Sequence, residues 1–213
     1  RLPVWPSIQQ RCSKLVEFGY RVNHNTPTPA FSLPELISLP ETVKKLSFRF
    51  PRAVSWFCKN YGMARSRLTH LEYLELVGMP ERAQTLLSPV DLPESLKTLR
   101  VVVNDWRPTV GVSLMTFRFP PNLTHLDIAL LDLNHAILPE TLTKLKLVLN
   151  SPNEIDWMAS MPRSVTELSV KSNNMQFIPS RISWHMIPPG LRSLDTHILG
   201  TATAELVSHF PPT

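Results

Sequence analysis

Glycine and cysteine are scarce in this chain of 213 residues, which contains 6 glycines and 2 cysteines. The cysteines, Cys12 and Cys58, form neither a C-x-x-C pair nor the dense framework of a small secreted module held by disulfides. This cysteine usage favours a reducing, cytoplasmic setting. No apolar run reaches the roughly 18 residues that a membrane-spanning helix requires, so we expect no membrane span.

Common catalytic and cofactor-binding motifs are also missing. The sequence has no glycine-rich phosphate loop and no H-E-x-x-H motif, and its 7 histidines are scattered. We therefore expect no metal, no cofactor and no enzymatic activity. Two pairs, His125 with Asp127 and His197 with Asp195, could in principle support acid–base chemistry, although such pairs are more often surface hydrogen bonds.

Charge of one sign does not accumulate in a long stripe. The formal net charge is +5, but basic residues are interleaved with acidic ones and lack a series of stacking aromatics. This pattern favours a protein partner over a nucleic acid. A nucleic-acid partner is the alternative, and its binding would depend on Lys144, Lys146 and Lys171 late in the sequence. Hydrophobic residues make up 43% of the chain, enough to predict a folded domain.

Proline is abundant, with 21 residues, and its positions follow a repeated phrase. Because proline lacks a backbone donor and fixes its own φ, it suits the corner where a returning segment meets a sheet. Two partial copies begin at Met161-Pro162 and Ile187-Pro188. The four complete copies are Leu39-Pro40-Glu41-Thr42-Val43, Leu92-Pro93-Glu94-Ser95-Leu96, Phe119-Pro120-Pro121-Asn122-Leu123 and Leu138-Pro139-Glu140-Thr141-Leu142.

An L-x-x-L-x-L frame follows each phrase, and two more copies of the frame lack the proline. Successive frames are 28, 28, 25, 27, 19, 23 and 26 residues apart, so about eight units fit the chain. The first positions are Leu15, Val43, Leu71, Leu96, Leu123, Leu142, Val165 and Leu191. The fourth positions are Phe18, Leu46, Leu74, Leu99, Leu126, Leu145, Leu168 and Leu194, and the sixth are Tyr20, Phe48, Leu76, Val101, Ile128, Leu147, Val170 and Thr196.

The frame predicts one short strand in each unit. Its fourth and sixth positions are apolar and alternate with polar residues, which is the period of a half-buried strand. Asparagine occupies the ninth position in four units, where its amide could hydrogen-bond backbone groups at the bend of the chain. These residues are Asn23, Asn104, Asn150 and Asn173.

From about residue 12 to residue 199 the pattern resembles the leucine-rich-repeat family, whose signature is L-x-x-L-x-L-x-x-N. The preceding L-P-x-[ST]-L phrase resembles subclasses that have a proline there, including the FNIP-type repeats of amoebae and some bacterial effector repeats. The chain lacks the Phe-Asn pair of the former and the constant short period of the latter. The resemblance implies an α/β solenoid, with a curved parallel sheet on the inner face and helices and irregular turns on the outer face.

Several segments between the frames have helical features. Ser151-Pro152-Asn153-Glu154 combines a capping residue, a first-turn proline and an acid ahead of an apolar stretch. Residues 80–87 and 203–207 have similar features. We therefore predict helices at these three places.

Aromatic residues are concentrated in residues 51–67, which include Trp56, Phe57 and Tyr61. At helical spacing they could form an exposed patch, but packing between the sheet and the outer layer is the favoured interpretation. At the end of the chain, residues 210–213 repeat the opening of the proline phrase. We therefore expect residues 1–213 to form a single repeat domain that is a fragment of a longer array.

Side chains that flank the buried positions are expected to form ladders along the inner face. The third positions are Glu17, Lys45, Tyr73, Thr98, His125, Lys144, Glu167 and Ser193. The fifth positions are Gly19, Ser47, Glu75, Arg100, Asp127, Lys146, Ser169 and Asp195, and the seventh are Arg21, Arg49, Val77, Val102, Ala129, Val148, Lys171 and His197. Among the seventh positions, Val77, Val102, Ala129 and Val148 form an aliphatic stripe bordered by charged residues. Such a stripe is typical of an interface core with a polar rim, although loops of the chain could instead cover it.

The sequence thus predicts a non-enzymatic scaffold that binds a protein partner through the inner face. The resemblance implies that such an array is often joined to another module, so this chain could be the substrate-recognition part of a ubiquitin-ligase adaptor. The alternatives are nucleic-acid binding and an enzyme with residues on the irregular segments. The predicted partner-binding residues are Tyr73, Glu75, Val77, Arg100, Val102, His125, Asp127, Lys144, Lys146 and Lys171.

Overall fold

The computed structural model describes the frames and the turns that lead into them. The described residues are 12–22, 39–50, 53, 57, 67–78, 84–86, 92–103, 111–113, 119–132, 137–149, 161–172 and 187–197. They contain the strands β1 (Glu17–Arg21), β2 (Lys45–Arg49), β3 (Tyr73–Gly78), β4 (Gln84–Leu86), β5 (Thr98–Val103), β6 (Gly111–Ser113), β7 (His125–Asp132), β8 (Lys144–Leu149), β9 (Glu167–Ser172) and β10 (Ser193–His197).

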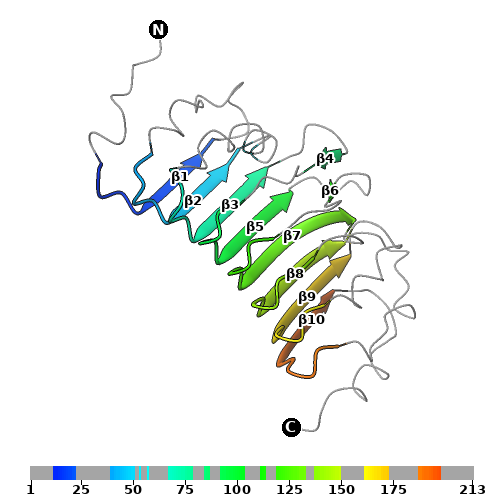
Figure 1. Ribbon diagram of the computed structural model, residues 1–213. Coiled ribbons are helices and arrows are strands. Elements are labelled where there is room, and N and C mark those ends of the chain that lie inside the picture. Colours follow the sequence, from blue (N-terminus) through cyan, green and yellow to red (C-terminus); the bar gives the residue numbers. More distant parts are fainter. Residues whose placement is uncertain are drawn as a thin grey trace.

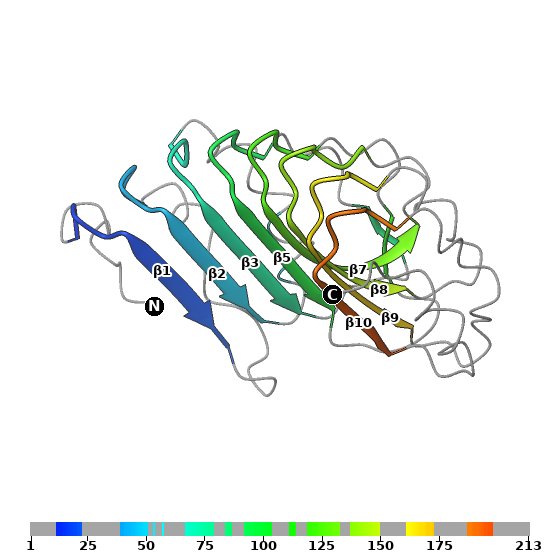
Figure 2. The same cartoon turned by 90° about the horizontal axis from the view of Figure 1, so that it is seen from below.

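One parallel sheet joins the strands in the order β1-β2-β3-β5-β7-β8-β9-β10, and β4 pairs with β6, which pairs with the end of β7. Figures 1 and 2 show the main strands side by side, running in one direction and forming a curved stack. Each frame contributes one main strand, and the fourth-position residues lie opposite one another, as in Leu126 opposite Leu99 and Leu145. The parallel solenoid predicted from the repeat is confirmed.

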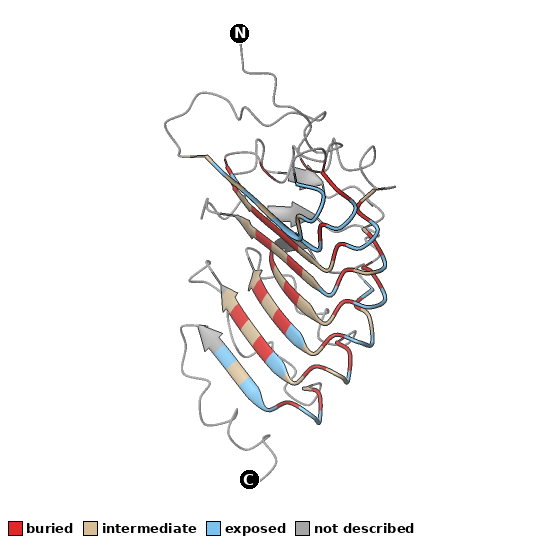
Figure 3. Cartoon of the chain, turned by 90° about the vertical axis from the view of Figure 1, so that its left-hand side faces the viewer, coloured by how far each residue is buried: buried red, intermediate tan, exposed pale blue. Residues whose placement is uncertain are grey.

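The first, fourth and sixth frame positions of the described units between β2 and β9 form the hydrophobic core, against which Leu15, Phe18, Tyr20 and Leu194 are packed while partly buried. Side chains in the middle units are almost completely buried, with Leu46 and Leu147 at 0% and Leu126 at 1% exposed. Burial alternates along the described parts of the main strands except β3, where Glu75 on the more open face is also buried (Figure 3). One face of the sheet is therefore packed and the other is more open. We name the sets of third, fifth and seventh positions on the open face row three, row five and row seven, and we call that face the inner face.

The proline phrase folds as a tight turn ahead of its main strand, and we call this turn, together with its equivalents in the two units that lack the proline, the proline turn. The amide of the first frame residue donates a hydrogen bond to the carbonyl three residues earlier, as from Leu142 to Pro139 (3.0 Å) and from Leu96 to Pro93 (3.0 Å). Leu71 makes the same bond to Leu68, although its unit lacks the proline. Proline favours this turn by restricting φ, but the hydrogen-bonded turn forms without it.

A ladder of polar side chains connects successive proline turns. Thr141 donates from Oγ1 to the carbonyls of Pro121 (2.6 Å) and Leu123 (2.9 Å) in the preceding unit. Thr42, Ser95 and Ser164 make equivalent bonds, and the Asn122 amide bonds the carbonyl of Glu94. This ladder explains the Ser or Thr of the phrase. The four ninth-position asparagines lie outside the described residues.

Replacement of Thr141 by valine tests the contribution of this ladder. The change keeps the shape of the side chain and removes both hydrogen bonds, so we expect the free energy of unfolding to fall by about 1 kcal/mol. Thr141→Ser, which retains the hydroxyl, is the matched control and should have a smaller effect. Urea denaturation of the two variants measures the difference, and equal stabilities would show that the hydroxyl contributes nothing.

The helix predicted at residues 80–87 is wrong, because Gln84–Leu86 forms β4. Its residues pair in parallel with Gly111–Ser113 in β6, so their backbone groups bond a distant segment rather than the next helical turn. Nothing in the local pattern revealed that partner. The helices predicted at residues 151–158 and 203–207 lie outside the described residues.

Phe57 confirms that part of the aromatic segment packs in the core. It is 1% exposed, and its ring centroid lies 6.2 Å from that of Phe48. Phe57 and the buried Ala53 both have helical backbone conformation, so this segment supplies helical residues behind the sheet. Trp56 and Tyr61 lie outside the described residues.

Gly78, the last residue of β3, is required by close backbone packing. A Cβ atom there would collide with the carbonyl oxygen of Phe50 and approach the amide nitrogen of Ala53 to 3.1 Å. We expect Gly78→Ala to destabilise the fold by about 1–3 kcal/mol, the usual cost of overpacking. Gly19→Ala is the control, because a Cβ at Gly19 has nothing within 4 Å. Thermal unfolding of both variants measures the effect, and equal midpoints would contradict this packing.

Candidate functional site

The inner face carries row three, row five and row seven in register. Row three runs without a break from Glu17 to Ser193, and row five runs from Gly19 to Asp195. Row seven pairs from Arg21 to Val102 and again from Ala129 to His197. Between these parts the register of β5 with β7 ends at the Val101 and Ile128 pair, and Leu130 of β7 pairs with Val112 of β6.

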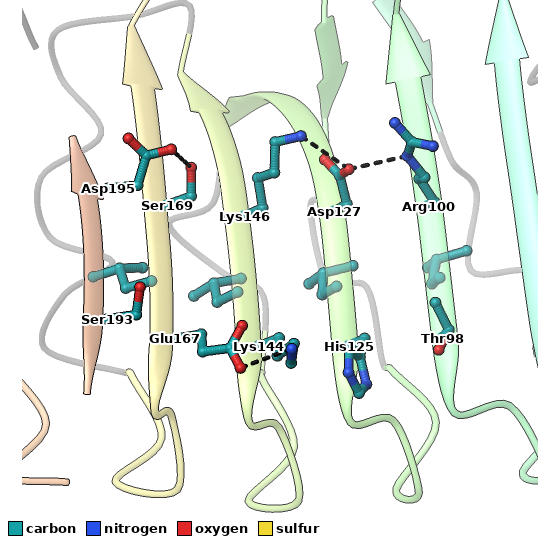
Figure 4. Close-up of a pocket in the computed structure, with 14 residues that line it drawn as sticks. Thr98, Arg100, His125, Asp127, Lys144, Lys146, Glu167, Ser169, Ser193 and Asp195 are labelled. Atoms are coloured by element: carbon teal, nitrogen blue, oxygen red, sulfur yellow. Dashed lines mark hydrogen bonds and ion pairs between the residues drawn. The ribbon is translucent and has the colours of Figure 1, made fainter. Parts of the chain in front are cut away.

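A hollow of about 330 Å³ lies between row three and row five, across β5, β7, β8, β9 and β10. Figure 4 shows the side chains of the two rows as parallel lines that project from successive strands. The buried leucines Leu99, Leu126, Leu145 and Leu168 lie between the two rows and also line this hollow, which we call the trough. Its polar walls are Thr98, His125, Lys144, Glu167 and Ser193 on one side and Arg100, Asp127, Lys146, Ser169 and Asp195 on the other.

Glu75 is the centre of an ionic network at one end of this trough. Its side chain is 2% exposed and accepts hydrogen bonds from Ser47 Oγ (2.6 Å), Arg49 Nε (2.9 Å) and Arg100 Nη1 (2.7 Å). A buried carboxylate is stable only when its oxygens are satisfied in this way. The three partners come from β2 and β5 on either side of β3, so the network joins three strands.

Arg100 extends the network across the sheet. Its Nε donates to Asp127 Oδ2 at 3.0 Å, and the same oxygen lies 3.2 Å from Lys146 Nζ (Figure 4). Charges therefore alternate along neighbouring strands from Arg49 to Lys146. On row three a separate ion pair joins Lys144 to Glu167 at 2.7 Å.

The network fixes the charge of its central groups. Burial alone would raise the pKa of Glu75, but the bonds from Ser47 and Arg49 and the charge of Arg100 lower it below its ordinary value. Burial likewise would lower the pKa of Arg100, but Asp127 and Glu75 raise it overall. Both groups are therefore ionised near neutral pH, and their side chains are held in place before any partner arrives.

The pair of His125 and Asp127 does not form an acid–base dyad. His125 Nδ1 lies 2.8 Å from Thr124 Oγ1, whereas Asp127 Oδ2 bonds Arg100 and Lys146. Partial burial and the neighbouring charge of Lys144 lower the pKa of His125, with Glu167 opposing them, so the imidazole is neutral near pH 7. In the other pair, the Asp195 carboxylate accepts a bond from Ser169 Oγ at 3.0 Å. The side chain of His197 lies outside the described part of the chain.

The structure places the predicted partner-binding residues on one face but distributes them unevenly. The trough brings together Arg100, His125, Asp127, Lys144 and Lys146. Tyr73, Glu75 and Val77 lie on β3 beyond it, Val102 lies on β5, and Lys171 lies on β9 next to Val148.

Several trough residues were absent from the predicted binding set. They are Thr98, Glu167, Ser169, Ser193 and Asp195, and Ser47 and Arg49 belong to the Glu75 network. Their row positions in the repeat already placed them on this face. The signal that would have selected Ser47, Glu167, Ser169 and Asp195 is complementary charge or hydrogen bonding between equivalent positions of adjacent units.

Within the described residues, no group of three or more His, Cys, Asp and Glu side chains could hold a metal ion. Nor does any helix among them have the length and apolar character required to cross a bilayer. The site that the described residues define is a trough with polar side chains along both walls and leucines between them, beside a set of ion pairs.

The parallel sheet of eight repeated units and its open inner face define a leucine-rich-repeat solenoid. No family model matches the chain, and no curated protein matches it either. Among solved structures, it is similar to the leucine-rich repeat-containing protein LegL7 from Legionella pneumophila. The TM-score is 0.51 at 17% sequence identity, and the match covers 91% of this chain and 70% of that one. This likeness shows the shared fold.

Proposed function

We propose that the chain is a non-enzymatic scaffold that binds a protein partner through the inner face. The observation that carries the proposal is the trough between row three and row five, whose charged walls are held by ion pairs between neighbouring strands. Side chains that are already ordered lose little conformational freedom when a partner binds. The trough thus offers a prearranged surface with charged walls across five strands.

A protein partner fits this surface better than a nucleic acid. Lys144 and Lys146, two of the three lysines on which a nucleic-acid partner would depend, already pair with Glu167 and Asp127. A nucleic acid carries a phosphate at every nucleotide, so a strand along the trough would bring repeated negative charge close to Glu167 and Asp127 as well as to the lysines. Alternating charges instead suit a partner with its own mixed charges, which fix orientation and register.

The finer assignments are part of the same proposal. The L-P-x-[ST]-L phrase supports a repeat subclass in which proline precedes the frame, similar to the FNIP type. In a longer cytoplasmic protein, residues 1–213 would act as the substrate-recognition part of an adaptor, for example in a ubiquitin ligase. In that longer protein the inner face would be the surface that binds the substrate.

A photo-crosslinking amino acid at Ser169 tests the proposal. Ser169 lines the trough, so a partner on the inner face should be captured there when cells that express the protein are irradiated. Glu140 is the control position, because it is exposed and lies in a proline turn rather than on a strand. We expect a discrete protein adduct from position 169 that is absent from position 140.

Purified adducts can be identified by mass spectrometry. The same adducts from both positions, or none from position 169, would contradict an inner-face scaffold. A nucleic-acid adduct at position 169 would replace the proposal with the alternative.

A further inference from the structure

Every described carboxylate on the inner face is already engaged by a neighbour. Glu17 pairs with Lys45, Glu167 pairs with Lys144, and Asp195 accepts a bond from Ser169. Glu75 and Asp127 belong to the network that contains Arg100. At Glu17, Glu75, Asp127 and Glu167 a basic ligand would therefore have to displace cations that the fold itself supplies, whereas the bond to Asp195 comes from a hydroxyl.

Two cations of the inner face, Lys146 and Lys171, are less fully paired than its carboxylates. No ion pair among the described residues includes Lys171, which lies half-buried on β9. Lys146 has one partner, Asp127, which keeps its bond to Arg100 if Lys146 turns away. The side chain of Lys146 is 40% exposed and Lys171 is partly exposed, and ion pairs at such exposure are weak. Their charge is available to an incoming anion.

Val148 lies between these two lysines. It is directly opposite Lys171 in the pairing of β8 with β9, and it is two residues after Lys146 on the same face of β8. Strand rise and spacing put Val148 about 7 Å from Lys146 and about 5 Å from Lys171, and they put the two lysines about 8 Å apart along the sheet. Val148 is partly buried and packs against the core cluster, so its position is fixed.

We propose that Lys146, Val148 and Lys171 form a subsite for an acidic segment of a protein partner. One or two carboxylates of the segment pair with Lys146 and Lys171, and an adjacent aliphatic side chain covers Val148. An extended peptide of about seven residues spans about 23 Å, roughly the width of the five strands that line the trough. The inference rests on the proposed function and adds the chemistry of the partner.

An aliphatic residue between the lysines favours a peptide over a nucleic acid. Single-stranded nucleic acids are held by stacking of bases on aromatic rings beside basic groups. Tyr73 is the one aromatic residue at the third, fifth and seventh positions, and it lies on β3, away from this subsite. Carboxylates with a neighbouring aliphatic group match both features of the subsite.

Selection from a random heptapeptide library displayed on phage tests the inference. The full chain is the bait, and a double variant, Lys146→Ala with Lys171→Ala, is used in a parallel selection. The control variant, Lys14→Ala with Arg163→Ala, removes the same charge from exposed turn positions. We expect the wild-type chain and the control to enrich peptides with Asp or Glu next to Val, Leu or Ile.

Fluorescence anisotropy with an enriched peptide then gives the affinities. The subsite variant should bind at least about tenfold more weakly and the control variant about as well as the wild type, with circular dichroism confirming that each is folded. Equal binding by both variants, or enrichment without acidic residues, would overturn the inference. So would tighter binding of a single-stranded oligonucleotide that depends on the same lysines. If the Ser169 adduct persists in any of these cases, the scaffold stands and only the acidic subsite falls.

Discussion

Replacing Glu75 by alanine is expected to lower the free energy of unfolding by about 3 kcal/mol at neutral pH, although Glu75 is a charged residue on the open face. The carboxylate is 2% exposed and has bonds to Ser47, Arg49 and Arg100. Its removal leaves two guanidinium groups facing each other across a cavity. Urea denaturation followed by circular dichroism measures the loss.

The control for Glu75 is Glu17→Ala, which breaks another ion pair of the same face. Glu17 and Lys45 are 64% and 55% exposed, so water replaces the lost contact and stability should change little. A loss at Glu75 no larger than that at Glu17 would show that the network does not hold the strands together.

The stabilisation by Glu75 also depends on pH. The pKa of Glu75 is lower in the folded chain, so its contribution is fully present above the ordinary pKa of a glutamate and is lost as the pH falls through the lowered value. The stability difference between the wild type and Glu75→Ala should therefore narrow on acidification. Denaturation series at neutral and acidic pH measure this, and a constant difference would contradict the pairing.

Replacing Leu126 by alanine is expected to cost about 4 kcal/mol, within the usual range for a buried leucine. Leu126 is 1% exposed and lies between Leu99 and Leu145 at the middle of the stack. The packed units on both sides restrict relaxation of the surrounding side chains, so the cavity left by the removed atoms of Leu126 should persist. Urea denaturation gives the loss of stability.

Leu194 is the matched control for Leu126, because it occupies the same frame position in β10. It is only partly buried, since no strand in the described part of the chain covers the other side of β10. Leu194→Ala should therefore cost clearly less than Leu126→Ala. Equal losses at the two positions would mean that burial does not increase toward the middle units.

Much of the inner face could be predicted because the repeat determines on which side of the sheet each side chain lies. Alternation with period two separates Leu126 and Ile128 from His125 and Asp127, and a frame shared by all units sets the register. These two rules placed each residue of rows three and five next to its counterpart in the adjacent units. The parallel order of the strands follows from the same repetition.

Features that depend on contacts outside the frame could not be predicted from the repeat. The pairing of β4 with β6 joins two irregular segments, and helical propensity at residues 80–87 suggested a different structure. The burial of Glu75 depends on Ser47 and Arg100, which are far from it in sequence. A polar residue on an open face is expected to be exposed, and only the converging side chains reverse that expectation.

Lysine footprinting of the complex with the partner captured at position 169 is the most direct test that the inner face binds. Brief acetylation followed by mass spectrometry compares lysines of the trough and of row seven with Lys14 and Lys97, which lie off these rows. We predict that Lys144, Lys146 and Lys171 lose reactivity in the complex while Lys14 and Lys97 keep theirs. Protection of Lys14 and Lys97 with unchanged inner-face lysines would contradict the account.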